Sequence, residues 1–148
     1  MPTTPIHLEI PGRPVPQPRH RATRGGRMYL PSSAPVRAFK AAVIATAKAK
    51  IRKPTTEPVA VRLVAMFTRP RSHLTAAGKL RAEAPDRPGR NCGDVDNLAK
   101  GVLDALNGIA WVDDSQVVDL RVIKAFGPKD YVDVWIDPPE ILTHGRAR

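Results

Sequence analysis

The sequence predicts an α+β fold, a small mixed β-sheet with two main helices packed on it, in a single domain spanning residues 1–148. Two segments repeat apolar residues at helical intervals, and four shorter segments alternate apolar and polar residues as strands do. The order is strand, helix, strand, helix, strand, strand, which favours a sheet with helices packed on it. A chain of this length buries enough surface for one hydrophobic core.

The first strand is predicted at residues 6–10, and it ends because the proline-rich residues 11–18 sustain neither a helix nor a ladder. Residues 19–29 then form a glycine-containing loop with five basic residues, in which Tyr29 can stack on a base. A solvated flexible loop is the alternative. The residues expected to contact DNA phosphates in this part of the chain are Arg13, Arg19, Arg21, Arg24 and Arg27.

The first helix is predicted to begin at residues 32–35, where two serines precede a proline that the first helical turn tolerates. Its apolar stripe contains Phe39, Val43 and Ala47 and runs to about Ile51. A second strand follows over about residues 58–68, with alternate apolar residues on one face.

Residues 69–93 show no periodicity and carry many basic side chains. A stretch this long without a pattern is uncommon inside a domain unless it is functional or disordered. We expect a mobile basic loop that orders on a nucleic acid. The expected DNA contacts in it are Arg69, Arg71, Lys79, Arg87 and Arg90.

The second helix is predicted from Asp96 or Asn97 to the stop signal at Asn107 and Gly108. Two strands follow, at about residues 118–126 and 132–136, and the turn at residues 127–130 predicts that they form a β-hairpin. Residues 138–148 are expected to be a flexible tail.

Carboxylates cluster around this second helix. Asp96 and Lys100 lie four residues apart on one helix face, Asp104 continues that face, and Asp94 comes just before it. A short apolar connection, residues 109–112, leads to a further acidic pair, and we expect it to bring that pair back to the first acids. The candidate metal ligands are Asp94, Asp96, Asp113 and Asp114. The alternative is that these acids only cap a helix and a turn.

The charge of the chain is asymmetric. Residues 1–93 hold 18 Lys and Arg against 4 Asp and Glu, whereas residues 94–148 hold 6 against 10. This pattern suggests a polyanion held by one part while carboxylates act on it from another. A single cysteine excludes an internal disulfide and cysteine-rich zinc motifs, and no apolar run is long enough to cross a membrane. We expect an intracellular protein without a signal peptide.

The acidic segment carries a long motif. Residues 93–108 read GDVDNLAKGVLDALNG, and residues 111–118 read WVDDSQVV. Together they resemble the RusA family of Holliday-junction resolvases, with the pattern D-x-D-N-x-x-K-x(3)-D-A-L followed by D-D-x-Q-V. The N-terminal residues 11–19, PGRPVPQPR, and the basic residues 69–90 are similar to the phage and prophage branch of that family.

The resemblance implies a RusA-like fold and a homodimeric, Mg²⁺-dependent endodeoxyribonuclease that cuts four-way DNA junctions by paired phosphodiester hydrolysis, with Mn²⁺ as a possible substitute. Position by position, the essential carboxylates correspond to Asp94, Asp96 and Asp114, and the essential lysine to Lys100. Asp113 corresponds to the neighbouring acid, and Asp104 to an acid that either is structural or supports the residues that hold the metal. The expected setting is the cytoplasm of a bacterium, in a host, phage or prophage context, with neither a membrane nor a small-molecule cofactor.

Two other functions stay open on the residues alone. One is a non-catalytic basic protein that binds nucleic acid, in which the acids only cap and solvate. The other is a metal-dependent nuclease that acts on flaps, replication forks or RNA.

Overall fold

The structure, a computed structural model, describes residues 4–141. Its main sheet has the strand order β1-β6-β4-β5. The strands are β1 (Ile6–Pro11), β4 (Val59–Thr68), β5 (Val117–Gly127) and β6 (Tyr131–Asp137). β6 pairs antiparallel with both β1 and β4, and β5 pairs parallel with β4. The predicted mixed sheet is therefore confirmed.

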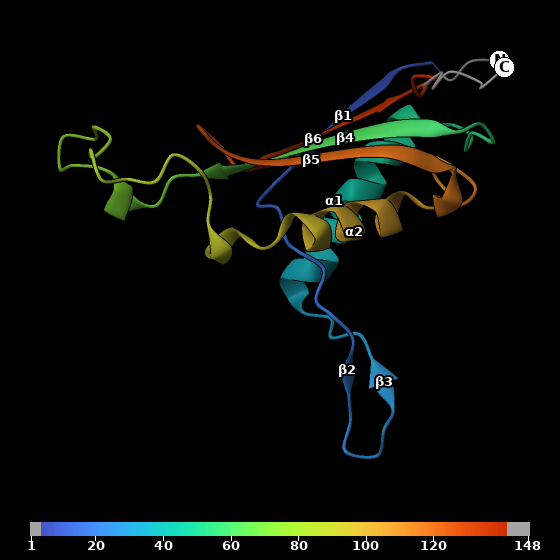
Figure 1. The fold of residues 1–148 in the computed structure, drawn as a ribbon, viewed down its shortest axis with the longest axis horizontal. Coiled ribbons are helices and arrows are strands. Elements are labelled where there is room, and N and C mark those ends of the chain that lie inside the picture. Colours follow the sequence, from blue (N-terminus) through green and yellow to red (C-terminus); the bar gives the residue numbers. More distant parts are fainter. Residues whose placement is uncertain (1–3, 142–148) are drawn as a thin grey trace, which may run out of the picture.

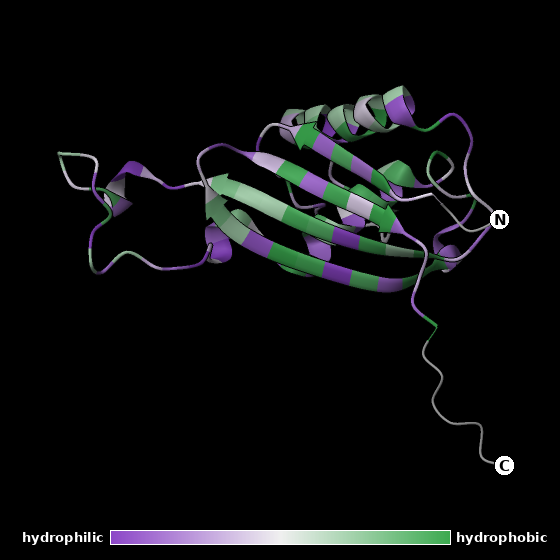
Figure 2. Ribbon diagram, turned by 90° about the horizontal axis from the view of Figure 1, so that it is seen from above, coloured by the Kyte–Doolittle hydropathy of each residue, from purple (hydrophilic) through white to green (hydrophobic). Residues whose placement is uncertain are grey.

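Two helices, α1 (Ala34–Lys50) and α2 (Val95–Leu106), pack on the same face of this sheet (Figure 1). Ser33 caps α1, and its side chain accepts the N–H of Val36. α1 packs against β1 and α2, while α2 also lies against β5. The face of the sheet away from the helices carries mixed side chains and is uncovered among the described residues (Figure 2).

The hydrophobic core lies between the helices and the sheet. Alternate residues of β4, β6 and β1 point into it, as period-two patterns require. Its largest fully buried side chains are Trp111, Phe67, Leu8, Ile10 and Leu63. Trp111 lies in the connection after α2, so this connection is anchored rather than free.

The predicted hairpin of the last two strands is wrong. β4, the segment before α2, α2 itself and β5 form a crossover unit, and such a unit places its two strands parallel. The chain then crosses the end of β4, so β6 pairs on the other side of β4. Asp130 Oδ1 fixes this crossing by accepting the N–H of Thr68 at 2.8 Å and its hydroxyl at 3.2 Å.

Two segments outside the sheet contain more regular structure than the sequence predicted. Within residues 19–29, β2 (Arg21–Ala22) and β3 (Met28–Tyr29) form a two-stranded ribbon that projects away from the main sheet (Figure 1). Residues 69–93 also project from the body, but they contain two 3-10 turns, η1 (Arg71–His73) and η2 (Arg90–Cys92). Of the predicted tail, residues 142–148 lie outside the described part.

Candidate active site

Asp94 and Asp96 lie at the N-terminal end of α2. Asp94 is the N-cap residue, so the helix begins slightly earlier than the sequence predicted. Its side chain makes no capping hydrogen bond, and both carboxylates are exposed. The positive end of the helix dipole favours negative charge here. Both acids are therefore available for a ligand.

A tight turn at Gly93 sets the position of Asp94. Gly93 has φ +82°, and a Cβ atom there would lie 2.6 Å from Cγ of Pro16. Only glycine combines this backbone conformation with such a close approach. The proline-rich segment therefore packs directly against the start of α2.

Arginines surround this end of the helix. A cleft of about 440 Å³ is lined by Asp94 and Asn97, by the proline-rich segment, and by Arg19, Arg21 and Arg90. These three arginines come from two segments far apart in the sequence, both of which the sequence identified as basic. The structure thus places basic side chains beside one of the predicted acids.

Lys100 lies one turn further along α2. Its Nζ is 3.6 Å from Asp104 Oδ2, and Gln17 Nε2 donates to the same oxygen at 2.8 Å. The backbone N–H of Gln17 also donates to the carbonyl of Asn97 at 3.0 Å. Gln17 therefore joins the proline-rich segment to the helix that carries Asp96 and Lys100.

Asp113 and Asp114 are held by neighbouring groups. Asp113 accepts the N–H and the hydroxyl of Ser115, and these hydrogen bonds hold the pKa of its carboxyl below the ordinary value. Gln116 completes a capping box for the 3-10 turn η3 (Asp114–Gln116). Asp114 Oδ1 accepts the indole N–H of the buried Trp111 at 3.0 Å. The side chain of Asp114 is thus anchored on the core.

The acidic pair does not meet Asp94 and Asp96 within one chain, contrary to the expectation from the sequence. α2 has 12 residues, so its two ends are about 18 Å apart. Asp113 and Asp114 follow its C-terminal end, where the chain turns back into β5 (Figure 1). Within residues 4–141, no three acidic, histidine or cysteine side chains lie close enough together to hold a metal ion.

The position of Lys124 independently shows how far Asp114 lies from Asp94 within one chain. Its Nζ donates to the carbonyls of Gly93 at 2.8 Å and Gly89 at 3.2 Å, so it fixes the turn before Asp94. Lys124 lies seven residues after Val117, which corresponds to about 23 Å of extended strand. The start of β5, beside Asp114, and the Asp94 end of α2 are therefore opposite ends of the molecule's helix layer.

The remaining predicted DNA contacts are spread over the projecting segments. Arg24 and Arg27 lie in the exposed tip of the β2–β3 ribbon, and Arg71 and Lys79 in exposed turns of residues 69–93. Arg13 lies 5.2 Å from the centre of the Phe67 ring and 4.0 Å from Asp130 Oδ1. Part of its role is therefore structural.

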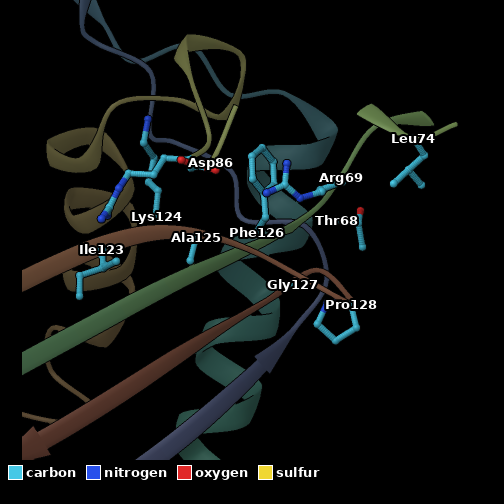
Figure 3. A pocket seen from close by; sticks show the side chains of 11 residues that line it. Thr68, Arg69, Leu74, Asp86, Ile123, Lys124, Ala125, Phe126, Gly127 and Pro128 are labelled. Atoms are coloured by element: carbon cyan, nitrogen blue, oxygen red, sulfur yellow. The ribbon is translucent and has the colours of Figure 1, made fainter. Parts of the chain in front are cut away.

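A pocket of about 590 Å³ separates the basic segment from the end of β5. Figure 3 shows Arg69 beside the ring of Phe126, and the guanidinium carbon is 4.3 Å from the ring centre. Arg69 also donates to the carbonyl of Pro85, and Arg87 lines the same pocket. These arginines face a cavity next to Lys124 rather than the Asp94 cleft.

Three residues of the site were not assigned a role from the sequence: Gln17, Trp111 and Lys124. Trp111 lies only two residues before Asp113, and this proximity could have indicated that the tryptophan supports the acidic pair. Gln17 and Lys124 are remote in sequence from the acids they support, and only the fold brings them there.

Residues 11–137 match the family model for the endodeoxyribonuclease RusA. The chain belongs to the RusA family. It is therefore an enzyme of a DNA-hydrolysing family, and a non-catalytic binding protein is the weaker interpretation.

The chain is also similar to individual proteins. The chain is 35% identical over 136 residues to the uncharacterized protein YqaN of Bacillus subtilis, covering 88% of this chain and 94% of that protein. It is 51% identical over 49 residues to the crossover junction endodeoxyribonuclease RusA of Escherichia coli K12 and to that of Enterobacteria phage 82. These matches cover 31% of this chain and 38% of each relative. Within the described residues, no helix is both long and apolar enough to span a membrane.

Proposed function

We propose that this chain is a Mg²⁺-dependent resolvase that cuts four-way (Holliday) DNA junctions by paired incisions, as a homodimer in the bacterial cytoplasm, in a host or phage context. The observation that carries the proposal is the cleft that combines Asp94 with Arg19, Arg21 and Arg90. Arginines bind phosphate oxygens, so they hold a DNA strand where the carboxylates act on it. The relatives named as crossover junction endodeoxyribonucleases support the choice of substrate.

The residues at the start of α2 fit a Mg²⁺ ion, with Mn²⁺ as a substitute. Mg²⁺ is usually held by one or two carboxylates together with water and substrate phosphates. Asp94 and Asp96 are two exposed carboxylates at one helix end, and Asp94 has no capping partner. When bound, the ion supplies a hydroxide-like nucleophile and neutralises charge on the phosphoryl group.

Lys100 supplies the remaining positive charge. It lies one helical turn from Asp96, where its ammonium group stabilises the charge that develops on the leaving oxygen. Its contact with Asp104 at 3.6 Å is also an ordinary ion pair of the i,i+4 type. The variant Lys100→Ala, tested on a junction that it still binds, decides between these roles. A catalytic lysine predicts that cleavage is lost, whereas an ion pair alone predicts that cleavage is unchanged.

In this proposal, the two projecting basic segments bind the DNA. The β2–β3 ribbon carries Arg21, Arg24 and Arg27, and residues 69–93 carry Arg71, Lys79 and Arg87. Residues 69–93 project beyond the N-terminal end of α2, and the ribbon extends away from the sheet on its helix side (Figure 1). We assign residues 69–93 the role of a mobile clamp that orders on the junction.

A homodimer explains why the acids are divided between two ends of α2. A two-fold axis across α2 reverses the helix direction, so the Asp94 end of one protomer meets the Asp114 end of the other. Asp114 of the partner subunit then joins Asp94 and Asp96, and each dimer has two complete sites. Two sites related by a two-fold axis match the two-fold symmetry of a four-way junction.

Cleavage of a labelled synthetic four-way junction, beside linear duplex, flap, fork and RNA substrates, tests the proposed function. Symmetric nicks confined to the junction, present with Mg²⁺ and absent with chelator, support it. Equal or better cutting of flaps, forks or RNA identifies a different nuclease. Binding without cleavage in Mg²⁺ or Mn²⁺ contradicts the enzymatic role.

Mixed dimers test the shared site. Asp94→Asn and Asp114→Asn chains are each expected to be inactive alone. A heterodimer of the two has one site with both changes and one unchanged site, so co-refolding the two chains restores nicking. The matched control combines Asp94→Asn with Asp96→Asn, which damages both sites and restores nothing. If Asp94 and Asp114 served the same site within one chain, neither mixture would cut.

A further inference from the structure

β5 is a long strand at the edge of the sheet. It has 11 residues, and its outer side carries no neighbouring strand among the described residues (Figure 2). Two large apolar side chains on it are exposed, Val118 by 60% and Leu120 by 44%. An open edge strand offers unpaired backbone groups, and exposed apolar residues along it indicate a binding surface.

Opposite charges flank Leu120. Asp119 and Arg121 are both exposed, and their neighbours in β4 are Ala60 and Arg62. Arg121 therefore lies beside another arginine, and Asp119, Asp137 and Glu140 line the same surface pocket. Within residues 4–141, neither Asp119 nor Arg121 forms an ion pair of 4 Å or less.

We propose that β5 pairs antiparallel with β5 of a second copy of this chain, about a two-fold axis at Leu120, to form one continuous eight-stranded sheet. The proposal rests on the homodimer of the proposed function and specifies its interface. In this register Asp119 lies opposite Arg121 of the partner subunit, twice per dimer. Leu120 lies beside its own symmetry mate.

The charge pattern selects this axis. Directly paired residues of a sheet share a face, so the two-fold axis of such a dimer passes through a residue position, not between two. An axis at Asp119 pairs two aspartates, and an axis at Arg121 pairs two arginines. Axes at Val118 or Val122 place neither charge opposite its complement. The axis at Leu120 alone sets both acids opposite both bases.

The same register is consistent with the shared catalytic site. It places Val117, the first residue of β5, opposite Ile123 of the partner subunit, and the turn that carries Asp114 directly precedes Val117. Lys124 contacts Gly93, directly before Asp94. Pairing about Leu120 therefore carries the Asp114 end of each protomer to the Asp94 end of the other, which an independent requirement, the division of the acids, also demands.

Disulfide trapping tests the axis. The variant Leu120→Cys is made in a Cys92→Ser background, because Cys92 is the natural free thiol. Directly opposed residues of antiparallel strands have Cα atoms about 4.5–5.5 Å apart, within the range of a disulfide. Mild oxidation is expected to link the two chains about tenfold faster than Val112→Cys, an exposed control away from the axis. Equal rates for the two variants contradict the proposal.

A charge exchange tests the register. Asp119→Arg and Arg121→Asp each place like charges opposite each other twice, so each is expected to weaken the dimer roughly tenfold in sedimentation equilibrium. The double variant restores both complementary pairs and recovers the dimer. Circular dichroism confirms that every variant is folded. A monomeric parent chain, or single variants that dimerise like the parent, overturns the proposal.

These outcomes are separate from the proposed function. A dimer that is trapped through Leu120→Cys and cuts no junction supports the interface and contradicts the resolvase. Junction cleavage by a parent chain whose dimer ignores both tests supports the resolvase and places its interface elsewhere.

Discussion

The two ends of α2 carry the same chemical groups in opposite physical states. At the C-terminal end, Asp113 is held by Ser115 and Asp114 by the indole of a fully buried tryptophan. At the N-terminal end, Asp94 makes no capping bond, and Asp94 and Asp96 are both exposed. One acidic pair is built into the fold, and the other is left available to a ligand.

This difference indicates that the two acidic pairs have different roles. A fixed carboxylate keeps its geometry without a ligand, so Asp114 is a rigid component that the fold supplies in advance. Asp94 lines a cleft with three arginines, and in the proposed function its carboxylate repels a phosphate until a cation is bound. In the proposed function, metal binding and DNA binding therefore depend on each other at the N-terminal end of α2.

Removing a carboxylate charge at the N-terminal end of α2 is expected to have the largest effect on cleavage. Asp94→Asn keeps a good N-cap residue, so the melting temperature should change little. Cleavage of a junction is expected to fall roughly 100-fold or more, because a charge that acts in the transition state is lost. Binding in a gel shift without metal should stay equal or become tighter, since repulsion of phosphate is relieved. Parallel loss of binding and cutting would indicate a folding defect.

Removing the hydrogen bond that holds Asp114 at the C-terminal end of α2 should have an intermediate effect on cleavage. Trp111→Phe keeps a buried ring but removes the N–H that holds Asp114, so we expect cleavage to fall roughly tenfold with the dimer intact. The control is Trp135→Phe, because Trp135 lies on the uncovered face of the sheet, beside His7 and Arg62. Equal rates for the two variants would show that the anchoring of Asp114 is unimportant.

Removing the side-chain hydrogen bond between the proline-rich segment and α2 should reduce cleavage less. Gln17→Leu removes the hydrogen bond to Asp104 while keeping the bulk of the side chain. We expect a roughly three- to tenfold loss in kcat with KM for the junction nearly unchanged, because Lys100 shares the carboxylate that loses its donor. A change in melting temperature alone, with kcat preserved, would assign Gln17 a purely structural role.

A surface ion pair far from both ends provides the smallest expected effect. Lys129 Nζ lies 2.9 Å from Glu9 Oε1, and this contact lowers the pKa of Glu9 below 4.5 and raises that of Lys129 above 10.5. The stabilisation is present above the ordinary pKa of Glu9 and is lost as the pH falls through the lowered value. It is likewise lost as the pH rises through the raised pKa of Lys129.

Denaturant unfolding of the parent chain and of Lys129→Ala checks this sign. The difference in the free energy of unfolding at pH 7 should be small, because solvent screens both exposed groups, and it should disappear in acid, because Glu9 is then neutral. A difference that persists at low pH would mean that Lys129 stabilises the protein by packing, through its contact with the Tyr131 ring.

The sequence predicted most of the secondary structure, because local patterns determine it. Both helices and the four long strands follow apolar periodicity, and the stop at Asn107 follows from its capping chemistry. The partner of β5 was predicted wrongly, because pairing depends on which edge of β4 each strand reaches. Nothing local to residues 117–137 contains that information. The short β2–β3 ribbon was missed because each strand has only two residues.

The site shows the same division between local and long-range information. Asp94, Asp96 and Lys100 form one motif on one helix, and the structure places them within two turns of α2. The expectation that Asp113 and Asp114 return to them failed, because the buried Trp111 anchors the connection at the far end of the helix. A single chain's sequence does not indicate that a second copy is needed to bring distant residues together.

The position of β6 in the sheet bears on when the enzyme can first exist during its synthesis. β6 is the last strand in sequence, yet it lies between β1 and β4, and β1 has no other partner in the sheet. The ribosome must therefore release residue 137 before the first strand can pair at all. A chain that stops early leaves β1 and one edge of β4 without a partner, and such long-range pairings form late and slowly. Chains that stop before β6 consequently lack the complete sheet on which the nuclease is built.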